Sequence, residues 1–313
     1  MIDVTCLGIL VADAVAKSVD FLPAEGKLEL VEQLQLYTGG CAVNTAIDLS
    51  KLGLKSAVIG KVGKDGFGDF LKKELSEQKV DISGLKTDSS CSTSASFVLV
   101  NSSGERSFLH CLGSNAEMRK EDVDFHIIEN SRILFVAGAL LLPKLDGKPT
   151  ADILEMAQSK GIYTALDTAW DSSGRWMTVI KHCLPYLDLF IPSLEEAKML
   201  TGKTNIEEMA DIFIAEGVKT AVIKLGKDGC FIKDQNGETH TVKAFTGITV
   251  ADTNGAGDSF VAGFLTGILK GWDLYQCGRF ANAVGAHCVM KLGASAGIKP
   301  MEEILEFLKN GGD

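Results

Sequence analysis

The segment DTNGAGDSF, residues 252–260, places a single acid among small residues at the start of an apolar helical pattern. Gly255, Ala256 and Gly257 leave the backbone N–H groups of a helix start unobstructed. With the positive end of the helix dipole, these groups form a site for an anion, and phosphate is the natural candidate. Asp258 falls in the first turn, where its carboxylate would face the bound group. A tight turn followed by an acid that complements the dipole is the alternative interpretation.

A second segment, GGCAVNTAIDLSKLG, carries residue types suited to binding a polyol. Gly39 and Gly40 remove side chains where a ligand must approach the backbone closely, and Asn44 offers both donors and acceptors to a hydroxyl. A turn before a helix, with Asn44 as its cap, would use the same residues. Asp13 ends a predicted strand, residues 5–13, and an ionised carboxylate there could accept hydrogen bonds from two vicinal hydroxyls.

Two more segments have polar residues or glycines at the ends of predicted elements. In SLEEAKMLTG, Ser193 and Glu196 have the S-x-x-E spacing of a helix capping box. The segment KLGKDGC, residues 224–230, comes at the end of a predicted strand. It contains two glycines, Gly226 and Gly229, shortly after Lys224. As a bare motif, KLGKDGC is equally typical of a turn between two strands.

The elements that must position these residues alternate between strand and helix. Short β-branched runs are separated by helical patterns, which predicts βαβ units and a largely parallel sheet covered on both faces. The predicted strands of this part are 132–138, 163–167, 188–193 and 220–226, and the last predicted helices are 256–270, 273–290 and 301–309. Residues 27–37 and 94–110 alternate instead, which predicts a small, more antiparallel sheet inserted into the α/β body.

Composition bounds the class of protein. The 313 residues include 31 basic and 41 acidic side chains, for a formal charge of −10, which argues against a nucleic-acid partner. Hydrophobic residues make up 46% of the chain, enough for a sizeable core. We expect one large α/β domain with an appendage.

The sequence lacks the patterns expected of a membrane helix, a signal peptide or a zinc site. The richest apolar run, residues 135–143, is about half the length that a membrane helix requires, and the N-terminus lacks the features of a signal peptide. The eight cysteines include no C-x-x-C pair, and no His is placed to complete a zinc site. We therefore expect reduced, mostly buried thiols and a cytoplasmic protein without a membrane partner.

Together, the two glycine-rich segments resemble the signatures of a known family. DTNGAGDSF resembles the C-terminal signature of the PfkB/ribokinase family of carbohydrate kinases, and GGCAVNTAIDLSKLG, followed by GKVGKDGFG, resembles its N-terminal signature. The similarity runs from residues 8–13 to residues 292–300. It implies a ribokinase-like three-layer αβα sandwich with a mostly parallel central sheet and a small β-sheet lid. Residues 1–313 would form one kinase domain, with lid segments at about 12–38 and 94–111.

The resemblance also implies an activity and roles for residues. The activity is an ATP-dependent transfer of the γ-phosphate to a hydroxyl, here a primary one, of a sugar or sugar derivative. Asp258 would be the base, and the amides of residues 255–258 would form the anion hole. The roles carried over from the family are sugar binding for Asp13, Gly39, Gly40 and Asn44, and nucleotide binding for Ser193, Lys224, Gly226, Gly229 and Asn282. Glu196 would organise Mg²⁺ through water, and Asp252 would lie near a monovalent cation, usually potassium.

The chain departs from the family pattern at several positions. Ribokinases proper carry Asn in place of Val11 and Lys in place of Cys41, which weakens ribose as the substrate. Ser193 replaces the usual Asn, which puts the geometry at Mg²⁺ in doubt. The segment LDTAW replaces D-P-N-x-R, so that Asp167 would keep at most an indirect role and Trp170 would pack rather than bind.

Two other functions remain open at this stage. An adenosine-type nucleoside kinase shares both signatures and would need an apolar or aromatic pocket beside the sugar site. A catalytically idle nucleotide or metabolite sensor is disfavoured by the complete DTNGAGD string, and no G-x-G-x-x-G points to a dehydrogenase. The lid should exclude water, and an apolar outer face on it would favour a homodimer.

Overall fold

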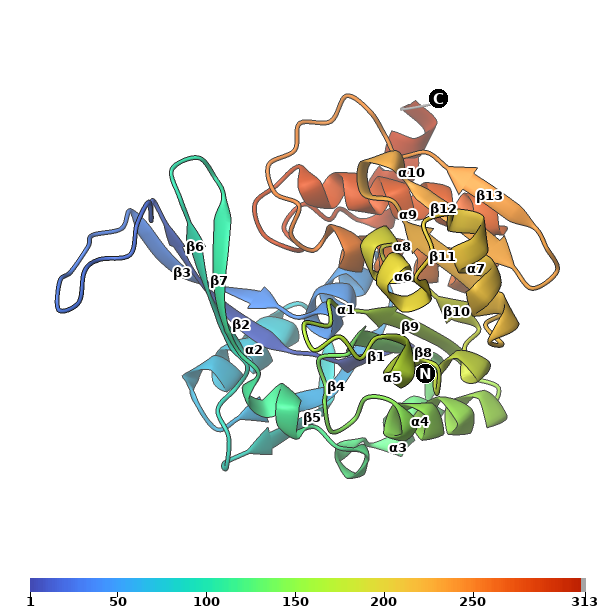
Figure 1. The fold of residues 1–313 in the computed structure, drawn as a ribbon, viewed down its shortest axis with the longest axis horizontal. Coiled ribbons are helices and arrows are strands. Elements are labelled where there is room, and N and C mark those ends of the chain that lie inside the picture. The colour runs from blue at the N-terminus through green and yellow to red at the C-terminus, as the bar shows by residue number, and fades with distance from the viewer. Residues whose placement is uncertain (311–313) are drawn as a thin grey trace.

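The computed structural model describes residues 1–310, and its core is a nine-stranded sheet with the order β13-β12-β11-β10-β9-β8-β1-β4-β5 (Figure 1). Neighbours from β5 through to β11 are parallel, and β12 and β13 are antiparallel to their neighbours. The strands are β1 (Ile2–Gly8), β4 (Ser56–Gly63), β5 (Asp81–Asp88), β8 (Ser131–Ala139), β9 (Tyr163–Thr168), β10 (Leu189–Phe190), β11 (Thr220–Lys224), β12 (Cys230–Asp234) and β13 (Thr239–Val242). The predicted mostly parallel sheet is confirmed.

Helices cover both faces of this sheet, because its strands alternate apolar side chains between two hydrophobic clusters. Phe135 points into one cluster, and its neighbours Leu134 and Val136 point into the other. The first cluster is covered by α1 (Cys41–Lys51), α2 (Gly66–Glu77), α8 (Ala256–Lys270), α9 (Leu274–Val289) and α10 (Met301–Asn310). The second is covered by α3 (Phe125–Glu129), α4 (Lys148–Ser159), α5 (Met177–Ile180), α6 (Leu194–Thr201) and α7 (Ile206–Ala215). These are the three layers of the expected sandwich.

A separate four-stranded sheet with the order β3-β2-β6-β7 stands to one side of the body (Figure 1). Its strands are β2 (Val11–Lys17), β3 (Gln33–Gly39), β6 (Ala95–Val100) and β7 (Arg106–Cys111). The β2–β3 and β6–β7 pairs are antiparallel, and the β2–β6 pair is parallel. We call this sheet the lid. It is the small, more antiparallel sheet that the alternating segments predict.

The structure corrects the expected strand at residues 5–13. The chain leaves the main sheet after Gly8 and enters the lid at Val11, so two strands replace one. A Cβ on Gly8 would lie 2.0 Å from the carbonyl oxygen of Ala137, which shows how tightly the chain packs as it leaves. Asp13 therefore lies inside a lid strand and not at a strand end.

Other expected strands are shorter than predicted. Of the alternating segment 27–37, only residues 33–37 lie in a strand, β3, which continues to Gly39, and the segment 188–193 contributes the two residues of β10. In contrast, the predicted helix 256–270 has the bounds of α8, and the two helices after it agree within a residue at each end.

Two expectations about thiols and membranes can be compared with the fold. All eight cysteines are free, and five of them are buried. Within residues 1–310, no helix is both long and apolar enough to cross a membrane.

Candidate active site

Chain segments far apart in the sequence converge at the carboxyl edge of the parallel strands, where open α/β sheets usually bind ligands. Asp167 lies near the end of β9, Ser193 follows β10, and Lys224 is the last residue of β11. Because β9, β10 and β11 are neighbours in the sheet, these residues reach the same edge. The N-terminus of α8 meets them there and brings Asp258.

The first turn of α8 has free backbone donors. Gly255 caps the helix at φ 76°, and no side chain caps it, whereas Ser193 and Asp273 cap α6 and α9 with complete capping boxes. Glycine is required at 255, since a Cβ would lie 2.4 Å from the carbonyl oxygen of Ala294. The Ala256 N–H donates weakly to Thr253 at 3.3 Å.

Of the four N–H groups predicted to form the anion hole, three, those of Gly255, Gly257 and Asp258, donate to no group among residues 1–310. These amides are available to a bound anion. They point from a helix N-terminus, so the helix dipole adds to their attraction for an anion.

The Asp258 carboxylate is held by the helix that carries the N-terminal signature. Its Oδ2 accepts a hydrogen bond from Asn44 Nδ2 at 2.8 Å. Burial raises the pKa of Asp258, while Asn44 and Lys224 act in the opposite direction. The other amide atom, Asn44 Oδ1, is buried and accepts no hydrogen bond from the described residues. An unused acceptor thus lies beside the predicted base.

Lys224 places a positive charge beside the first turn of α8. Its Nζ forms an ion pair with Asp167 and lies 3.5 Å from the position that a Cβ on Gly257 would take. Burial lowers the pKa of Lys224, but the charges of Asp167 and Glu196 outweigh this effect and the net shift is upward. The ammonium group therefore stays charged.

The partner of this lysine, Asp167, is almost fully buried. Burial raises its pKa to about 7, and the charge of Lys224 opposes the shift. Sequence reasoning assigned Lys224 to a nucleotide loop and Asp167 to an indirect role, and it did not pair them. The order β9-β10-β11 brings them together, which no local motif reveals.

Ser193 and Glu196 form the capping box that their spacing predicts. Ser193 Oγ accepts from the Glu196 N–H, and Glu196 Oε2 accepts from the Ser193 N–H at 2.8 Å and from Thr168 Oγ1 at 3.2 Å. Glu196 Oε1 accepts nothing from the described residues. Within residues 1–310, no cluster of three or more His, Cys, Asp or Glu side chains could hold a metal ion. A single carboxylate with one free oxygen fits Mg²⁺, which is usually bound by one or two carboxylates and keeps waters and phosphate oxygens as ligands.

A cavity of about 520 Å³ opens beside the anion hole. Its lining includes the predicted nucleotide residues Lys224, Gly226, Gly229 and Asn282, together with Ala256 and Gly257. The glycines belong to the turn between β11 and β12, as the plainer interpretation predicts. Asn282 also donates to the carbonyls of Val242 and Lys243 and so fixes the chain after β13. A cavity of this size accommodates a nucleotide.

A second, smaller cavity lies between the lid and the body, and Asp13 lines it. A Cβ on Gly39 would lie 2.3 Å from Asp13 Oδ2, and one on Gly40, at φ 90°, would lie 2.5 Å from the Ile9 carbonyl oxygen. Both glycines are therefore required by close approach. Burial raises the pKa of Asp13 to about 6, and the Ser96 hydroxyl and Arg106 oppose the shift.

Asp252 lines the same cavity and joins the lid to the body. Its Oδ1 forms an ion pair of 2.7 Å with Arg106 of β7 and accepts the Asn254 N–H, while Oδ2 accepts the Gly293 N–H. Sequence analysis missed Arg106, because a lone arginine after a turn carries no distinctive pattern. The Asp252 carboxylate is therefore already neutralised by a side chain of this protein.

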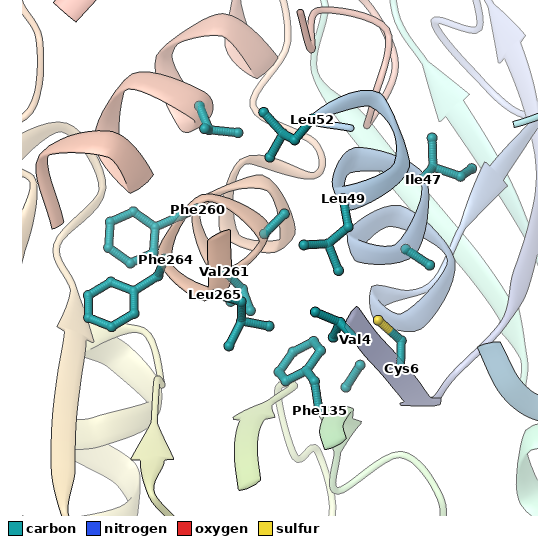
Figure 2. Close-up of a cluster of buried hydrophobic side chains, with 14 of the residues drawn as sticks. Val4, Cys6, Ile47, Leu49, Leu52, Phe135, Phe260, Val261, Phe264 and Leu265 are labelled. Atoms are coloured by element: carbon teal, nitrogen blue, oxygen red, sulfur yellow. The ribbon is translucent and has the colours of Figure 1, made fainter. Parts of the chain in front are cut away.

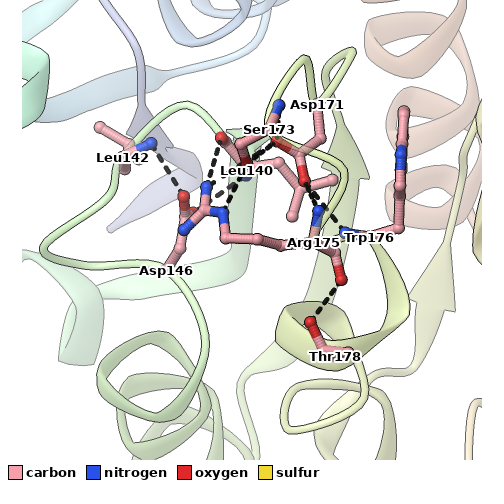
Figure 3. Close-up of polar contacts among 8 residues, drawn as sticks. All are labelled: Leu140, Leu142, Asp146, Asp171, Ser173, Arg175, Trp176 and Thr178. Atoms are coloured by element: carbon pink, nitrogen blue, oxygen red, sulfur yellow. Dashed lines mark hydrogen bonds and ion pairs between the residues drawn. The ribbon is translucent and has the colours of Figure 1, made fainter.

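The segment that replaces D-P-N-x-R leads into a compact turn (Figure 3). Asp171 Oδ2 accepts from the N–H groups of Arg175 and Trp176. The ring of Trp170 packs edge to face against the ring of Trp176, with 5.1 Å between the ring centroids. Trp170 nevertheless stays 55% exposed. Trp170 therefore contacts the protein along one side only and is largely exposed.

Comparison with known proteins shows which class of protein this chain resembles. A ribokinase of Haemophilus influenzae is 28% identical over 314 residues and covers 98% of each chain. A probable fructokinase-2 of Arabidopsis thaliana is 30% identical over 310 residues and covers 93% of each. A solved ribokinase of Arabidopsis thaliana, complexed with ribose and ATP, has a TM-score of 0.87 at 23% identity and covers 98% of this chain and 99% of its own. The fold is ribokinase-like, as predicted.

The class is that of carbohydrate kinases, phosphotransferases with an alcohol group as acceptor. The model of the pfkB family of carbohydrate kinases matches residues 1–301. The chain belongs to this family.

Proposed function

We propose that this kinase transfers the γ-phosphate of ATP to a primary hydroxyl of a sugar or sugar derivative. The observation that carries the proposal is the convergence of Asp258, Lys224 and the free amides at the N-terminus of α8. A nucleotide-sized cavity lies on one side of this point, and the helix that carries Asn44 lies on the other. The Arabidopsis ribokinase crystallised with ribose and ATP supports this pair of ligands.

The residues divide the reaction between positioning and charge stabilisation. Phosphoryl transfer passes through a loose transition state with charge spread over the equatorial oxygens, so electrostatics matter more than base strength. Asp258 accepts the proton of the attacking hydroxyl, and Asn44 Oδ1, which has no partner among the described residues, is the acceptor for a second hydroxyl of the same substrate. Lys224 and the amides of Gly257 and Asp258 bind the transferred group.

Glu196 is the residue that we propose for Mg²⁺, through bound water. Magnesium would neutralise the β- and γ-phosphates when ATP binds. Glu196 is nine-tenths buried and anchored by the Ser193 N–H, so its free Oε1 is held in place.

We propose that a monovalent cation binds near Asp252 through main-chain carbonyl oxygens alone. The Asp252 side chain fits a resident cation poorly, because Arg106 and two N–H groups already use its oxygens. Replacing potassium with tetramethylammonium in the assay tests this proposal. An unchanged kcat would dismiss the cation.

A nucleoside is the second candidate acceptor, favoured by the apolar lining of the lid cavity. Val15, Val98, Val100 and Phe108 line it beside Tyr37. This is the apolar and aromatic pocket that a nucleoside base would need next to the sugar site.

A panel of acceptors separates the candidates. ADP release from ATP and Mg²⁺ would be measured with hexoses, pentoses, sugar phosphates, ketodeoxy acids and nucleosides. We expect turnover with a sugar or sugar derivative to exceed that with any nucleoside. Turnover with nucleosides alone would establish the second candidate, and ADP release independent of every acceptor would overturn both.

Gly39→Ala tests the acceptor side of the site. The added Cβ would collide with Asp13 Oδ2, so the Asp13 side chain must move from its place in the lid cavity. We expect the KM for the acceptor to rise about 10-fold or more, a loss of about 1.4 kcal/mol, with the KM for ATP unchanged. Gly66→Ala is the matched control, since nothing lies within 4 Å of its Cβ position. Equal effects of the two changes would contradict the role of Asp13.

The lid, in our proposal, excludes water during transfer and pairs with a second copy of the chain. Its outer face is apolar across neighbouring strands, with Leu34, Leu36, Phe97 and Leu109 exposed. A second copy would present the same complementary patch. Light scattering should show a dimer for the wild type and a monomer for Phe97→Asp. A monomeric wild type would refute the dimer.

A further inference from the structure

Helices α1 and α8 pack against each other over the main sheet (Figure 2). Besides apolar contacts, one face of α1 makes polar contacts to the first turn of α8. Asn44 donates to the Asp258 carboxylate at 2.8 Å, and Thr45 Oγ1 donates to the Asp258 carbonyl at 3.4 Å. One turn further along α1, Asp48 Oδ2 accepts from Ser259 Oγ at 2.6 Å. Asp48 and Ser259 are both fully buried.

Asp48 also faces a third element, the loop that follows α9. Its Oδ1 is buried without a hydrogen bond, and so is Ser295 Oγ in that loop. The two groups are close enough for the Ser295 hydroxyl to lower the pKa of Asp48. Lys51 Nζ donates to the Ser295 carbonyl at 2.8 Å, and the preceding residue, Ala294, presses on the Gly255 cap of α8. Asp48 therefore lies where α1, α8 and the loop behind the anion hole meet.

We propose that Asp48 is a positioning residue that holds the first turn of α8, and with it Asp258, against α1 and the 293–295 loop. The inference rests on the proposed function, because it assumes that Asp258 is the base. Asp48 Oδ1 and Ser295 Oγ can pair in either protonation state, since an ionised Asp48 would accept from the Ser295 hydroxyl and a protonated Asp48 would donate to it. Both unpaired atoms would then have a partner, which buried polar groups normally require.

The charges around Asp48 agree with a neutral carboxyl. Burial raises its pKa to about 7, an effect that Ser259, Ser295 and Lys51 oppose and that Asp258 of α8 reinforces. From α9, Cys288 faces the same space as a thiol whose own pKa burial raises. Because the native carboxyl binds its proton more tightly than the unfolded chain does, the contribution of Asp48 to stability is fully present below about pH 4 and is lost as the pH rises through about 7.

Three variants and one control test the proposal. Thr5→Val is the control, because Thr5 and Ser131 form another buried hydroxyl pair of 2.6 Å far from the site. We expect Ser259→Ala and Asp48→Ala to lower kcat about 10-fold with the KM of both substrates within about 2-fold, since small displacements of reacting groups are costly. Thr5→Val should lower Tm by a comparable amount and leave kcat at the wild-type value.

The variant Asp48→Asn distinguishes a positioning role from a purely structural one. Asn accepts from Ser259, donates to Ser295 and does not titrate, so kcat should recover to within about 3-fold of wild type. The decline of Tm between pH 5 and 8 should also be smaller than in the wild type. Wild-type kcat in both alanine variants, or no recovery in Asp48→Asn, would overturn the proposal. A wild-type protein that phosphorylates no acceptor would instead refute the proposed function, and the Tm comparison would still test the Asp48 contacts.

Discussion

Replacing Asp258 with Asn is expected to lower kcat at least about 100-fold while ATP and the acceptor still bind. Asn keeps the shape of the side chain but cannot accept a proton. The amides of Gly257 and Asp258 and the charge of Lys224 remain, so the anion hole is intact. Turnover by ADP release and dissociation constants by calorimetry measure the two effects separately.

Asp69→Asn is the matched control for this experiment. Asp69 also lies in the first turn of a helix, α2, after a glycine, and it has no place in the site. If Asp258 merely complemented the helix dipole, both changes would cost a few tenths of a kcal/mol in stability and leave kcat alone. Wild-type turnover in Asp258→Asn would therefore contradict its role as the base.

Lys224→Met is expected to lower kcat by about 100-fold or more, because a preorganised charge at a transferring phosphoryl group stabilises the transition state by several kcal/mol. The change also leaves Asp167 without its partner. Removing one member of a buried ion pair costs about 3–5 kcal/mol, although Asp167 can reduce this cost by taking up a proton, since burial raises its pKa to about 7.

The double variant Lys224→Met with Asp167→Asn separates the two effects. It contains no unpaired charge, so Tm should return toward the wild-type value, whereas kcat should stay low. Recovery of kcat together with Tm would show that Lys224 serves only to neutralise Asp167. Wild-type kcat in Lys224→Met itself would remove Lys224 from the mechanism altogether.

Features encoded by neighbouring residues could be predicted from the sequence. The bounds of α8 follow from an apolar helical pattern between Gly255 and Gly271, which both adopt the left-handed conformation at its ends. The capping box of Ser193 and Glu196 follows from its spacing. The resemblance of the two signatures to the family's also predicts that Asn44 and Asp258 belong to the same site. The structure shows these two side chains in contact.

Features created by long-range contacts could not be predicted. The Lys224–Asp167 pair depends on the order of strands in the sheet, and the Arg106–Asp252 pair depends on where the lid stands over the body. Asp13 was expected at a strand end, because an apolar run of nine residues does not reveal that the chain changes sheets at Ile9 and Leu10. The contacts of Asp48 depend on three elements that meet only in the fold.

We expect the ion pair between Arg106 and Asp252 to affect how the product leaves the site. Asp252 precedes the turn that begins α8 by three residues, and its side chain is only 4% exposed in the pair. The lid cannot swing away from the body until this contact separates, and partly buried charges are screened only weakly by salt. Dissociation of the phosphorylated product, where it requires this contact to separate, should therefore change little with ionic strength.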